Sequence, residues 1–249
     1  MKLLTFRLLC LFFLVPFVTS GQTNTSIGLE AAVTNDLFTY YGDNQIVSSP
    51  TTPSGYIGFT ISEGITDNLS VETGVILKGY KTGYQLDIES VTGKFVKSSN
   101  GLQAVQFPIR LLMEHPLNQS NASIFTILGY HYCLSLGEYG GGSSGMRISS
   151  SNDSLRTSSL RSSGFEKSHS LLQAGLGFNY EFRNEAQVYI SCSYYTGFKA
   201  IINQEIQYQI NNQPANYITG ISQGDFWGIS IGYKHPFKLG GPPLDSQKH

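Results

Sequence analysis

The chain has 249 residues and a formal net charge of −1 at neutral pH, and only 13% of its residues are charged. This balance excludes the basic face that a nucleic-acid-binding protein needs. Glycine (27 residues), tyrosine (15) and phenylalanine (15) are abundant, which favours strands and tight turns over long amphipathic helices.

The first 21 residues have the order of a secretory signal peptide. Lys2 and Arg7 form a basic start, and Leu8–Val18 is an apolar run that only Cys10 and Pro16 interrupt. Small residues follow at positions 19–21. The apolar run is shorter than the roughly 20 residues of a membrane-spanning helix, so cleavage is favoured over a retained anchor. We therefore predict an exported protein with a signal peptide (1–21), a main domain (22–239) and a flexible C-terminal tail (240–249).

Segments in the main domain alternate apolar and polar residues with the period of two that is typical of β-strands. In Ser170–Phe182, the even positions from Leu172 onwards are apolar and the odd positions are polar or glycine. Ile124–Leu134 is apolar on both faces, so its register stays open. The eight predicted strands cover residues 25–34, 54–63, 69–80, 102–112, 122–134, 168–182, 186–196 and 225–235.

Long and short connections alternate strictly between these strands. The short ones are 64–68, 113–121 and 183–185, and the long, polar ones are 35–53, 81–101, 135–167 and 197–224. A membrane barrel sorts its connections in this way, with short periplasmic turns and long outer loops. Because backbone groups in lipid must all be paired, a spanning sheet has to close on itself. We therefore predict an all-β fold: an eight-stranded antiparallel up-and-down transmembrane β-barrel after a cleaved signal peptide.

The third long connection is expected to be exposed and mobile. Its stretches 140–145 and 149–163 are rich in glycine and serine and offer little apolar surface to bury.

The polar face of each strand is predicted to point into the barrel. Charged residues on this face should pair there as an interior charge network, since a lone buried charge costs several kcal/mol: Glu30, Glu72, Lys78, Arg110, Glu181 and Lys234. Arg110 is the expected hub, because its planar fork can hold two carboxylates. The interior of an eight-stranded barrel is just filled by side chains or holds one small ligand, so no wide pore is expected.

Aromatic residues near the predicted strand ends indicate girdles at the two membrane interfaces. They come in pairs: Tyr80 and Tyr84, Tyr130 and Tyr132, Tyr194 and Tyr195, Phe226 and Trp227, and Tyr233 and Phe237.

Short glycine–aromatic motifs in this order resemble the PorT-like outer-membrane β-barrel family of Gram-negative bacteria. They are Phe107–Arg110, Leu128–Tyr130, Gln173–Tyr180 and Ser193–Phe198. The resemblance implies an eight-stranded barrel in the outer membrane, and for some members a part in protein secretion, with no catalytic residues to carry over. The chain departs from the family in its tail and in its long, serine-rich third connection.

Residues suited to metal binding or catalysis do not form a recognisable site. His131 and Cys133 share a strand face, but a zinc site needs about four ligands, and no second pair is evident. Glu166, Ser168 and His169 lie close in sequence, yet neighbouring strand residues point to opposite faces, so Ser168 and His169 would not meet. We predict no enzyme activity, no cofactor and no metal.

Two functions remain open from the sequence. The first is a small outer-membrane barrel that contacts outer-membrane lipid and has a structural or interaction role through its long loops, with an envelope or secretion protein as partner. The alternative is a soluble exported barrel that binds a small apolar ligand. The interior charges favour the first, because ligand cavities are lined mainly by apolar side chains.

Overall fold

The structure is a computed structural model that describes residues 25–41, 47–48, 53–87, 95–117, 121–139, 146–149, 154–161, 166–210 and 213–237. The predicted signal peptide and C-terminal tail lie outside these residues. Within the described ranges, no helix is long and apolar enough to cross a membrane.

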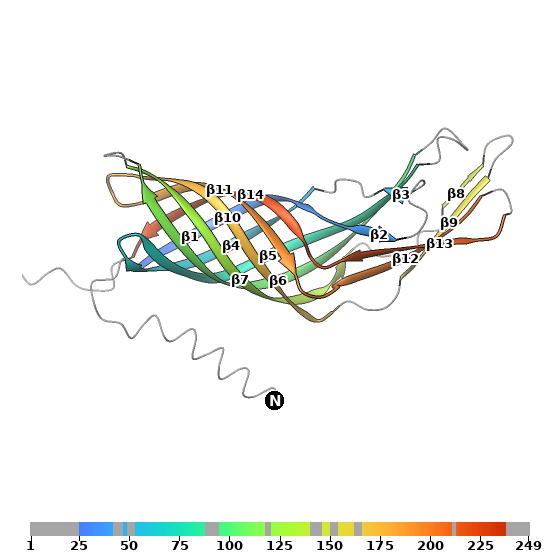
Figure 1. The fold of residues 1–249 in the computed structure, drawn as a ribbon, viewed down its shortest axis with the longest axis horizontal. Coiled ribbons are helices and arrows are strands. Elements are labelled where there is room, and N and C mark those ends of the chain that lie inside the picture. Colours follow the sequence, from blue (N-terminus) through green and yellow to red (C-terminus); the bar gives the residue numbers. More distant parts are fainter. Residues whose placement is uncertain are drawn as a thin grey trace, which may run out of the picture.

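Eight long antiparallel strands form a closed barrel (Figure 1). They are β1 (Thr25–Asp36), β4 (Pro53–Thr66), β5 (Leu69–Asp87), β6 (Phe95–Pro116), β7 (Ala122–Tyr139), β10 (Ser168–Glu181), β11 (Gln187–Gly197) and β14 (Phe226–Pro236). Each strand pairs with the next one in this order, and β14 pairs with β1. The predicted eight-stranded up-and-down topology is confirmed.

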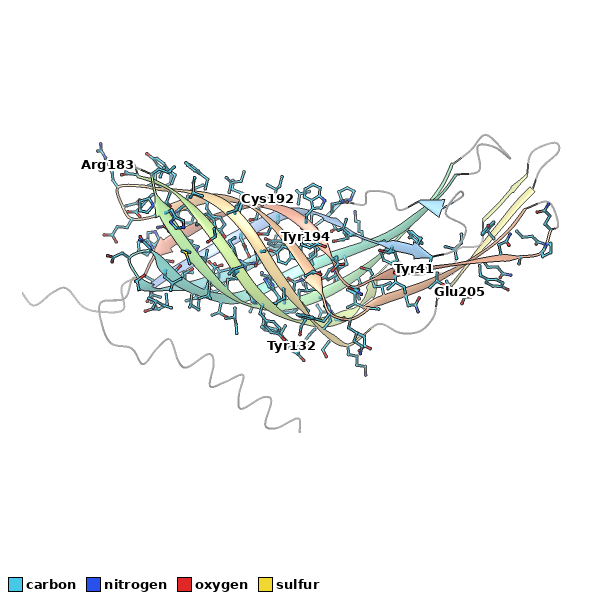
Figure 2. The ribbon with its side chains drawn as sticks, in the orientation of Figure 1. Tyr41, Tyr132, Arg183, Cys192, Tyr194 and Glu205 are labelled. Atoms are coloured by element: carbon cyan, nitrogen blue, oxygen red, sulfur yellow. The ribbon has the colours of Figure 1, made fainter. Side chains whose placement is uncertain are left out.

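The outer wall of the barrel is apolar. Along β14, buried and exposed residues alternate one by one, and the exposed ones are Trp227, Ile229, Ile231, Tyr233 and His235. Large aliphatic side chains elsewhere on the wall are at least 60% exposed: Leu29, Val33, Ile57, Leu128 and Leu176. Figure 2 shows side chains projecting outward from the barrel strands, among them Tyr132, Cys192 and Tyr194. A continuous apolar surface of this kind suits the hydrocarbon layer of a bilayer.

Three aromatic residues predicted for the interfacial girdles lie inside the barrel instead. Tyr80, Tyr195 and Phe226 are at most 1% exposed. Their sequence neighbours Tyr194 and Trp227 point outward, with exposed fractions of 46% and 43%. Adjacent residues of a strand face opposite sides of the sheet, so only one member of such a pair can join a girdle.

The long connections carry further strands, which we call the extension. A five-stranded sheet has the order β2 (Thr39–Tyr41), β13 (Asn216–Ser222), β12 (Ile202–Ile210), β9 (Ser154–Arg161) and β8 (Met146–Ser149). In addition, β3 (Val47–Ser48) pairs with β5, and the β5–β6 ladder runs on to Asp87 and Phe95. Figure 1 shows the extension at the end of the barrel opposite the short turns.

The third connection, for which the sequence predicted no strand, contains β8 and β9. These strands pair with each other, and β9 also pairs with β12 from Leu155 to Arg161. The serine-rich sequence has no apolar alternation to reveal a strand, and its backbone partners are supplied by a segment about 50 residues away in the chain.

Candidate functional site in the barrel interior

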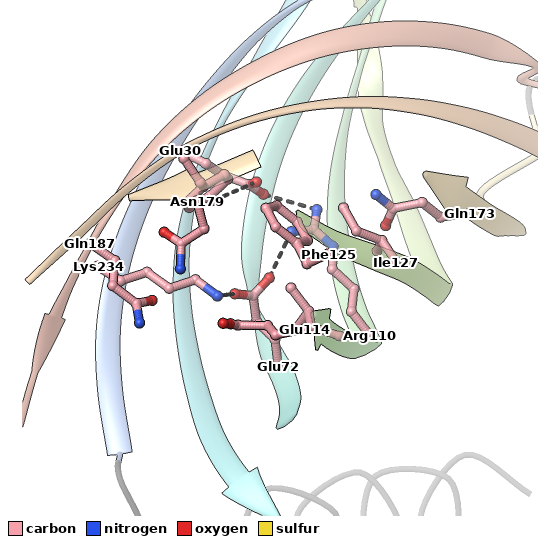
Figure 3. Close-up of a pocket in the computed structure, with 12 residues that line it drawn as sticks. Glu30, Glu72, Arg110, Glu114, Phe125, Ile127, Gln173, Asn179, Gln187 and Lys234 are labelled. Atoms are coloured by element: carbon pink, nitrogen blue, oxygen red, sulfur yellow. Dashed lines mark hydrogen bonds and ion pairs between the residues drawn. The ribbon is translucent and has the colours of Figure 1, made fainter. Parts of the chain in front are cut away.

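Four predicted network residues meet inside the barrel, in its half near the short turns (Figure 3). Arg110 Nη1 donates to Glu72 Oε1 at 2.9 Å, and Nη2 donates to Glu30 Oε1 at 2.9 Å. Lys234 Nζ lies 2.8 Å from Glu72 Oε2. We call Glu30, Glu72, Arg110 and Lys234 the charge cluster. Its two carboxylates and two cations balance each other.

Hydroxyl groups complete the coordination of both carboxylates. Ser62 Oγ donates to Glu72 Oε2 at 2.9 Å, and Tyr189 Oη donates to Glu30 Oε2 at 3.2 Å. Each of the four carboxylate oxygens therefore has at least one donor. Buried ions are tolerated when they are paired and hydrogen-bonded in this way.

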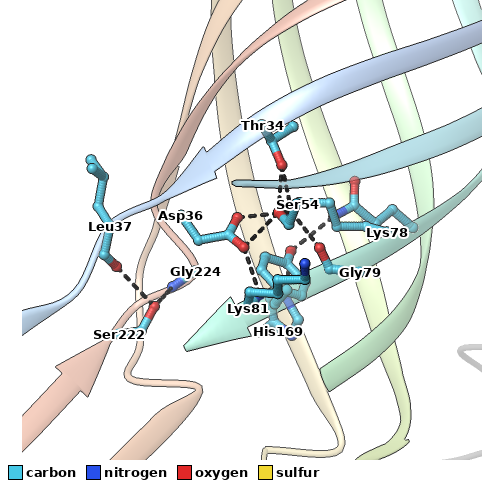
Figure 4. Close-up of polar contacts among 12 residues, drawn as sticks. Thr34, Asp36, Leu37, Ser54, Lys78, Gly79, Lys81, His169, Ser222 and Gly224 are labelled. Atoms are coloured by element: carbon cyan, nitrogen blue, oxygen red, sulfur yellow. Dashed lines mark hydrogen bonds and ion pairs between the residues drawn. The ribbon is translucent and has the colours of Figure 1, made fainter. Parts of the chain in front are cut away.

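Lys78 belongs to a second buried cluster, at the end of the barrel where the extension begins (Figure 4). Its Nζ lies 2.8 Å from Asp36 Oδ1 and donates to Thr34 Oγ1 (2.9 Å), Ser54 Oγ (2.7 Å) and the Gly79 carbonyl (2.7 Å). Sequence reasoning missed Asp36 because the first strand was predicted to stop at residue 34. Its even position, shared with Glu30 and Thr34, is the signal that places it on the inward face.

Buried aromatic rings pack beside the Lys78 cluster. Lys78 Nζ lies 4.7 Å from the centre of the Phe226 ring, which stacks on Tyr195 with 4.1 Å between ring centres. The Tyr195 hydroxyl lies 3.4 Å from that of Tyr56. Together with Tyr80, whose ring centre is 6.0 Å from that of Phe226, these residues form what we call the aromatic layer: Tyr56, Tyr80, Tyr195 and Phe226.

Glu181 does not join the charge cluster. It is exposed at the short-turn end of β10, where it accepts a hydrogen bond of 3.3 Å from Gln187 Nε2. It has the inward parity that the sequence predicted, but it is the last residue of its strand. There the barrel opens into a polar mouth of about 630 Å³, lined partly by Glu114, Glu181, Gln187 and Lys234. A carboxylate at this mouth stays hydrated and needs no buried partner.

Little space is left around the charge cluster. The cavity beside it has a volume of about 10 Å³ and is bounded by the cluster together with Leu112, Phe125 and Ile127. That is room for about one water molecule, whereas small-molecule sites occupy roughly 300 to 1,000 Å³. The alternative of an apolar ligand held in the interior is therefore not supported at this site.

Of the residues considered for metal binding or catalysis, His131, Cys133 and His169 are buried inside the barrel, and His169 is in register with Cys133. His131 Nε2 is paired with Gln173 Oε1 at 2.8 Å, and Cys133 is a buried free thiol. His169 is buried, while Ser168 is exposed on the other side of β10. Among the residues that the structure covers, no group of three or more His, Cys, Asp or Glu could hold a metal ion.

A closed β-barrel with an apolar wall and a filled, charge-paired interior defines the class of small membrane-spanning β-barrels. No protein-family model matches the sequence, and a search of curated proteins finds no match.

Solved structures with a similar fold include several outer-membrane proteins. Neisserial surface protein A has a TM-score of 0.49 and 10% identity, over 87% of this chain and 100% of that one. A major outer membrane protein from Thermus thermophilus has a TM-score of 0.40 and 10% identity, over 86% and 99%. Outer membrane protein AlkL, solved in DMPC bilayers, has a TM-score of 0.39 and 14% identity, over 90% and 96%. All three TM-scores lie below 0.5, so none of these likenesses carries an argument about function.

Proposed function

We propose that the protein is a small outer-membrane β-barrel, closed to solutes, with a structural or protein-interaction role at the cell surface and no enzyme activity. The observation that carries this proposal is that apolar side chains face outward and the charge cluster lies inside. This distribution is the reverse of that in a soluble protein. A charge on the lipid face would cost roughly 2–4 kcal/mol at the midplane, whereas inside the barrel each charge of the cluster has a partner.

The two ends of the barrel support an outer-membrane orientation. The strands are joined by short turns at one end, and the long connections build the extension at the other (Figure 1). Outer-membrane barrels place short turns in the periplasm and long loops outside. The extension then lies at the cell surface.

The extension supplies the surface for an interaction role. Within the described residues, β2 and β8 are the two edges of its five-stranded sheet. Exposed edges offer backbone donors and acceptors to which a partner can add a strand. The motifs that resemble the PorT-like family lie on β6, β7 and β10 and at the end of β11, and that resemblance favours a partner from a secretion or envelope assembly.

Membrane fractionation combined with gel mobility tests the barrel. The protein should be recovered with outer membranes, and unboiled and boiled samples should migrate differently, because a sheet without edges resists cold detergent. Recovery in the periplasmic fraction without detergent would contradict the proposal.

Site-specific photo-cross-linking in intact cells tests the interaction role. A cross-linker placed at Gln213, between β12 and β13 in the extension, should give a discrete adduct with an envelope protein. The same group at Tyr180, which is exposed near the short turns, is the matched control. Equal adducts at both positions would argue against a role of the extension.

A further inference from the structure

The mouth at the short-turn end of the barrel carries carboxylates that the charge cluster does not neutralise. Among the described residues that line the mouth, three are acidic and one is basic: Asp67, Glu114, Glu181 and Lys234. Lys234 is committed to the charge cluster, because its Nζ lies 2.8 Å from Glu72 Oε2 and its side chain is only 8% exposed. Since the charge cluster is balanced by itself, the mouth has an excess of negative charge.

Two of these carboxylates belong to a row of inward side chains on three adjacent strands. We call the row the mouth group: Glu114 on β6, Ser123 on β7, and Asn179 and Glu181 on β10. Ser123 Oγ donates to Glu114 Oε2 at 3.3 Å, and Ser123 is in register with Asn179. Asn179 and Glu181 are two residues apart and therefore share a face of β10. The four side chains thus follow one another around the inner wall.

Asn179 places an unpaired acceptor in this row. The residue is 5% exposed, and its Oδ1 is buried without a hydrogen-bond partner among the described residues. It lines the small cavity beside the charge cluster, which shares Glu114, Gln187 and Lys234 with the mouth (Figure 3). Buried acceptors are normally paired, so this oxygen points to a ligand. A water molecule would satisfy the oxygen but leave the charge of the mouth unbalanced, whereas a cation satisfies both.

We propose that the mouth group binds a divalent cation, Ca²⁺. This ion takes oxygen ligands from carboxylates, amide carbonyls and water at about 2.3 to 2.6 Å. The mouth group offers the carboxylates of Glu114 and Glu181 and the amide oxygen of Asn179, with the Ser123 hydroxyl between them. Water in the open mouth completes the shell, and the two carboxylates match the charge of the ion.

The spacing of the strands suits an ion between the two carboxylates. Because β7 separates β6 from β10, their backbones are about 10 Å apart at the usual spacing of neighbouring strands. Side chains that reach inward from both strands can meet at one ion in this span. Mg²⁺ fits less well, because it demands a near-ideal octahedron and gives up its waters reluctantly.

This site differs from those that the sequence led us to consider. The prediction of no metal weighed histidine and cysteine ligands, whereas the mouth group contains neither. It also has only two carboxylates, so it is not one of the groups of three or more His, Cys, Asp or Glu, of which the described residues hold none suited to a metal. The inference needs the barrel but not the interaction role proposed above.

The test uses the full-length protein, folded in uncharged detergent micelles and freed of metal with EDTA. CaCl₂ is the probe, and titration calorimetry should show one Ca²⁺ per barrel with a Kd of about 0.1 to 1 mM, the range of extracellular calcium modules. In urea unfolding, 10 mM CaCl₂ should raise the folding equilibrium constant about 10- to 100-fold over NaCl of equal ionic strength. Glu114→Gln and Glu181→Gln should each weaken Ca²⁺ binding about tenfold or more, and Asn179→Asp should tighten it, because affinity follows the number of charged ligands.

Glu63→Gln is the matched control and should leave the Kd unchanged. Glu63 is a carboxylate at the same end of the barrel, but it accepts from Thr25 Oγ1 at 2.6 Å and does not line the mouth. Heat-dependent gel mobility shows that each variant still forms the barrel. Absence of Ca²⁺ binding by the folded, unmodified barrel would overturn the inference. Equal affinities of the Glu63, Glu114 and Glu181 variants, or binding of Mg²⁺ as tight as that of Ca²⁺, would overturn it as well.

Discussion

At the scale of single residues, Arg110 is the position on which the charge cluster depends. Its guanidinium is the only group that contacts Glu30 and Glu72 together among the described contacts. Without it, Glu72 keeps Lys234 and Ser62, but Glu30 keeps only the tyrosine hydroxyl of Tyr189. The cluster would then hold one excess negative charge in a buried site with room for about one water molecule.

We therefore expect Arg110→Met to lower the free energy of unfolding by about 3 to 5 kcal/mol, the usual effect of removing one partner from a buried ion pair. Urea unfolding in phospholipid vesicles measures this change. Arg183→Met is the matched control: Arg183 lies exposed in the turn between β10 and β11 and should change stability by less than about 0.5 kcal/mol. Adding Glu30→Gln to Arg110→Met should recover part of the loss, and equal stabilities of the two arginine variants would refute the role of Arg110.

Parity and charge together predict which residues face the interior, but not where the interior ends. The sequence places Glu30, Glu72, Arg110 and Lys234 on inward faces, and the structure brings these four together. The sequence does not reveal that Glu181 lies at the open mouth of the barrel or that Asp36 is still inside the barrel. Both depend on how far each strand runs relative to its neighbours, and this is set by pairing with other strands rather than by local pattern.

At the scale of elements, glycines on inward faces make room for aromatic rings of the neighbouring strand. Gly232 of β14 pairs with Tyr189 of β11, and a Cβ at position 232 would overlap the Tyr189 ring. The Tyr189 ring covers Gly232, and the Tyr189 hydroxyl donates to Glu30. Gly232 thus links strand packing to the charge cluster.

Gly232→Ala should destabilise the barrel by about 1 to 3 kcal/mol, the range for overpacking a filled interior, because the Tyr189 ring has to leave its place. Gly79→Ala is the control, since a Cβ there would meet only the Gly55 carbonyl oxygen at 3.9 Å. Urea midpoints of the two variants give the comparison. A Gly79→Ala loss as large as that of Gly232→Ala would show that loss of glycine itself, rather than the ring contact, is responsible.

Disulfide cross-linking tests whether β9, a strand that the sequence did not predict, pairs with β12. Ser158 and Gln207 are register partners in the β9–β12 ladder, so Ser158→Cys combined with Gln207→Cys should form a disulfide, which requires Cα atoms about 4.4 to 6.8 Å apart. Ser158→Cys with Asn203→Cys, four residues out of register, should stay reduced. Both pairs are made with Cys192→Ser, because Cys192 is an exposed thiol. Non-reducing peptide mapping distinguishes the outcomes, and similar yields for both pairs would argue against a fixed ladder.

The eight barrel strands could be predicted because seven of them carry an apolar face that alternates with a polar one and the eighth, β7, carries a continuous apolar run. The extension could not. Its strands β8 and β9 are held by backbone pairing to one another and to β12, and a serine-rich stretch has no pattern of its own. For β7, apolar on both faces in the sequence, the barrel settles the register: Phe125 and Ile127 are buried, while Ile124 and Leu128 are exposed.

At the scale of the whole molecule, the strict alternation of connection lengths predicted closure of the barrel, and closure fixes the interior volume. Eight strands leave a space that side chains just fill. In this barrel the space is shared by the charge cluster, the aromatic layer and the cluster around Lys78. We expect the charge cluster and the aromatic layer each to close the barrel at its own level.

This arrangement predicts how the barrel conducts ions. The unmodified protein should show no large, steady conductance in planar bilayers, because both levels are filled. Glu72→Ala with Arg110→Ala removes side chains from the charge cluster only, so the aromatic layer should keep that variant closed. Tyr195→Ala with Phe226→Ala thins the aromatic layer only, and the charge cluster should keep that variant closed as well. The variant with all four changes should conduct steadily, provided that its heat-dependent gel mobility shows a folded barrel. A porin-like current in the unmodified protein would contradict the filled interior, and a current in either double variant would show that a single level closes the barrel.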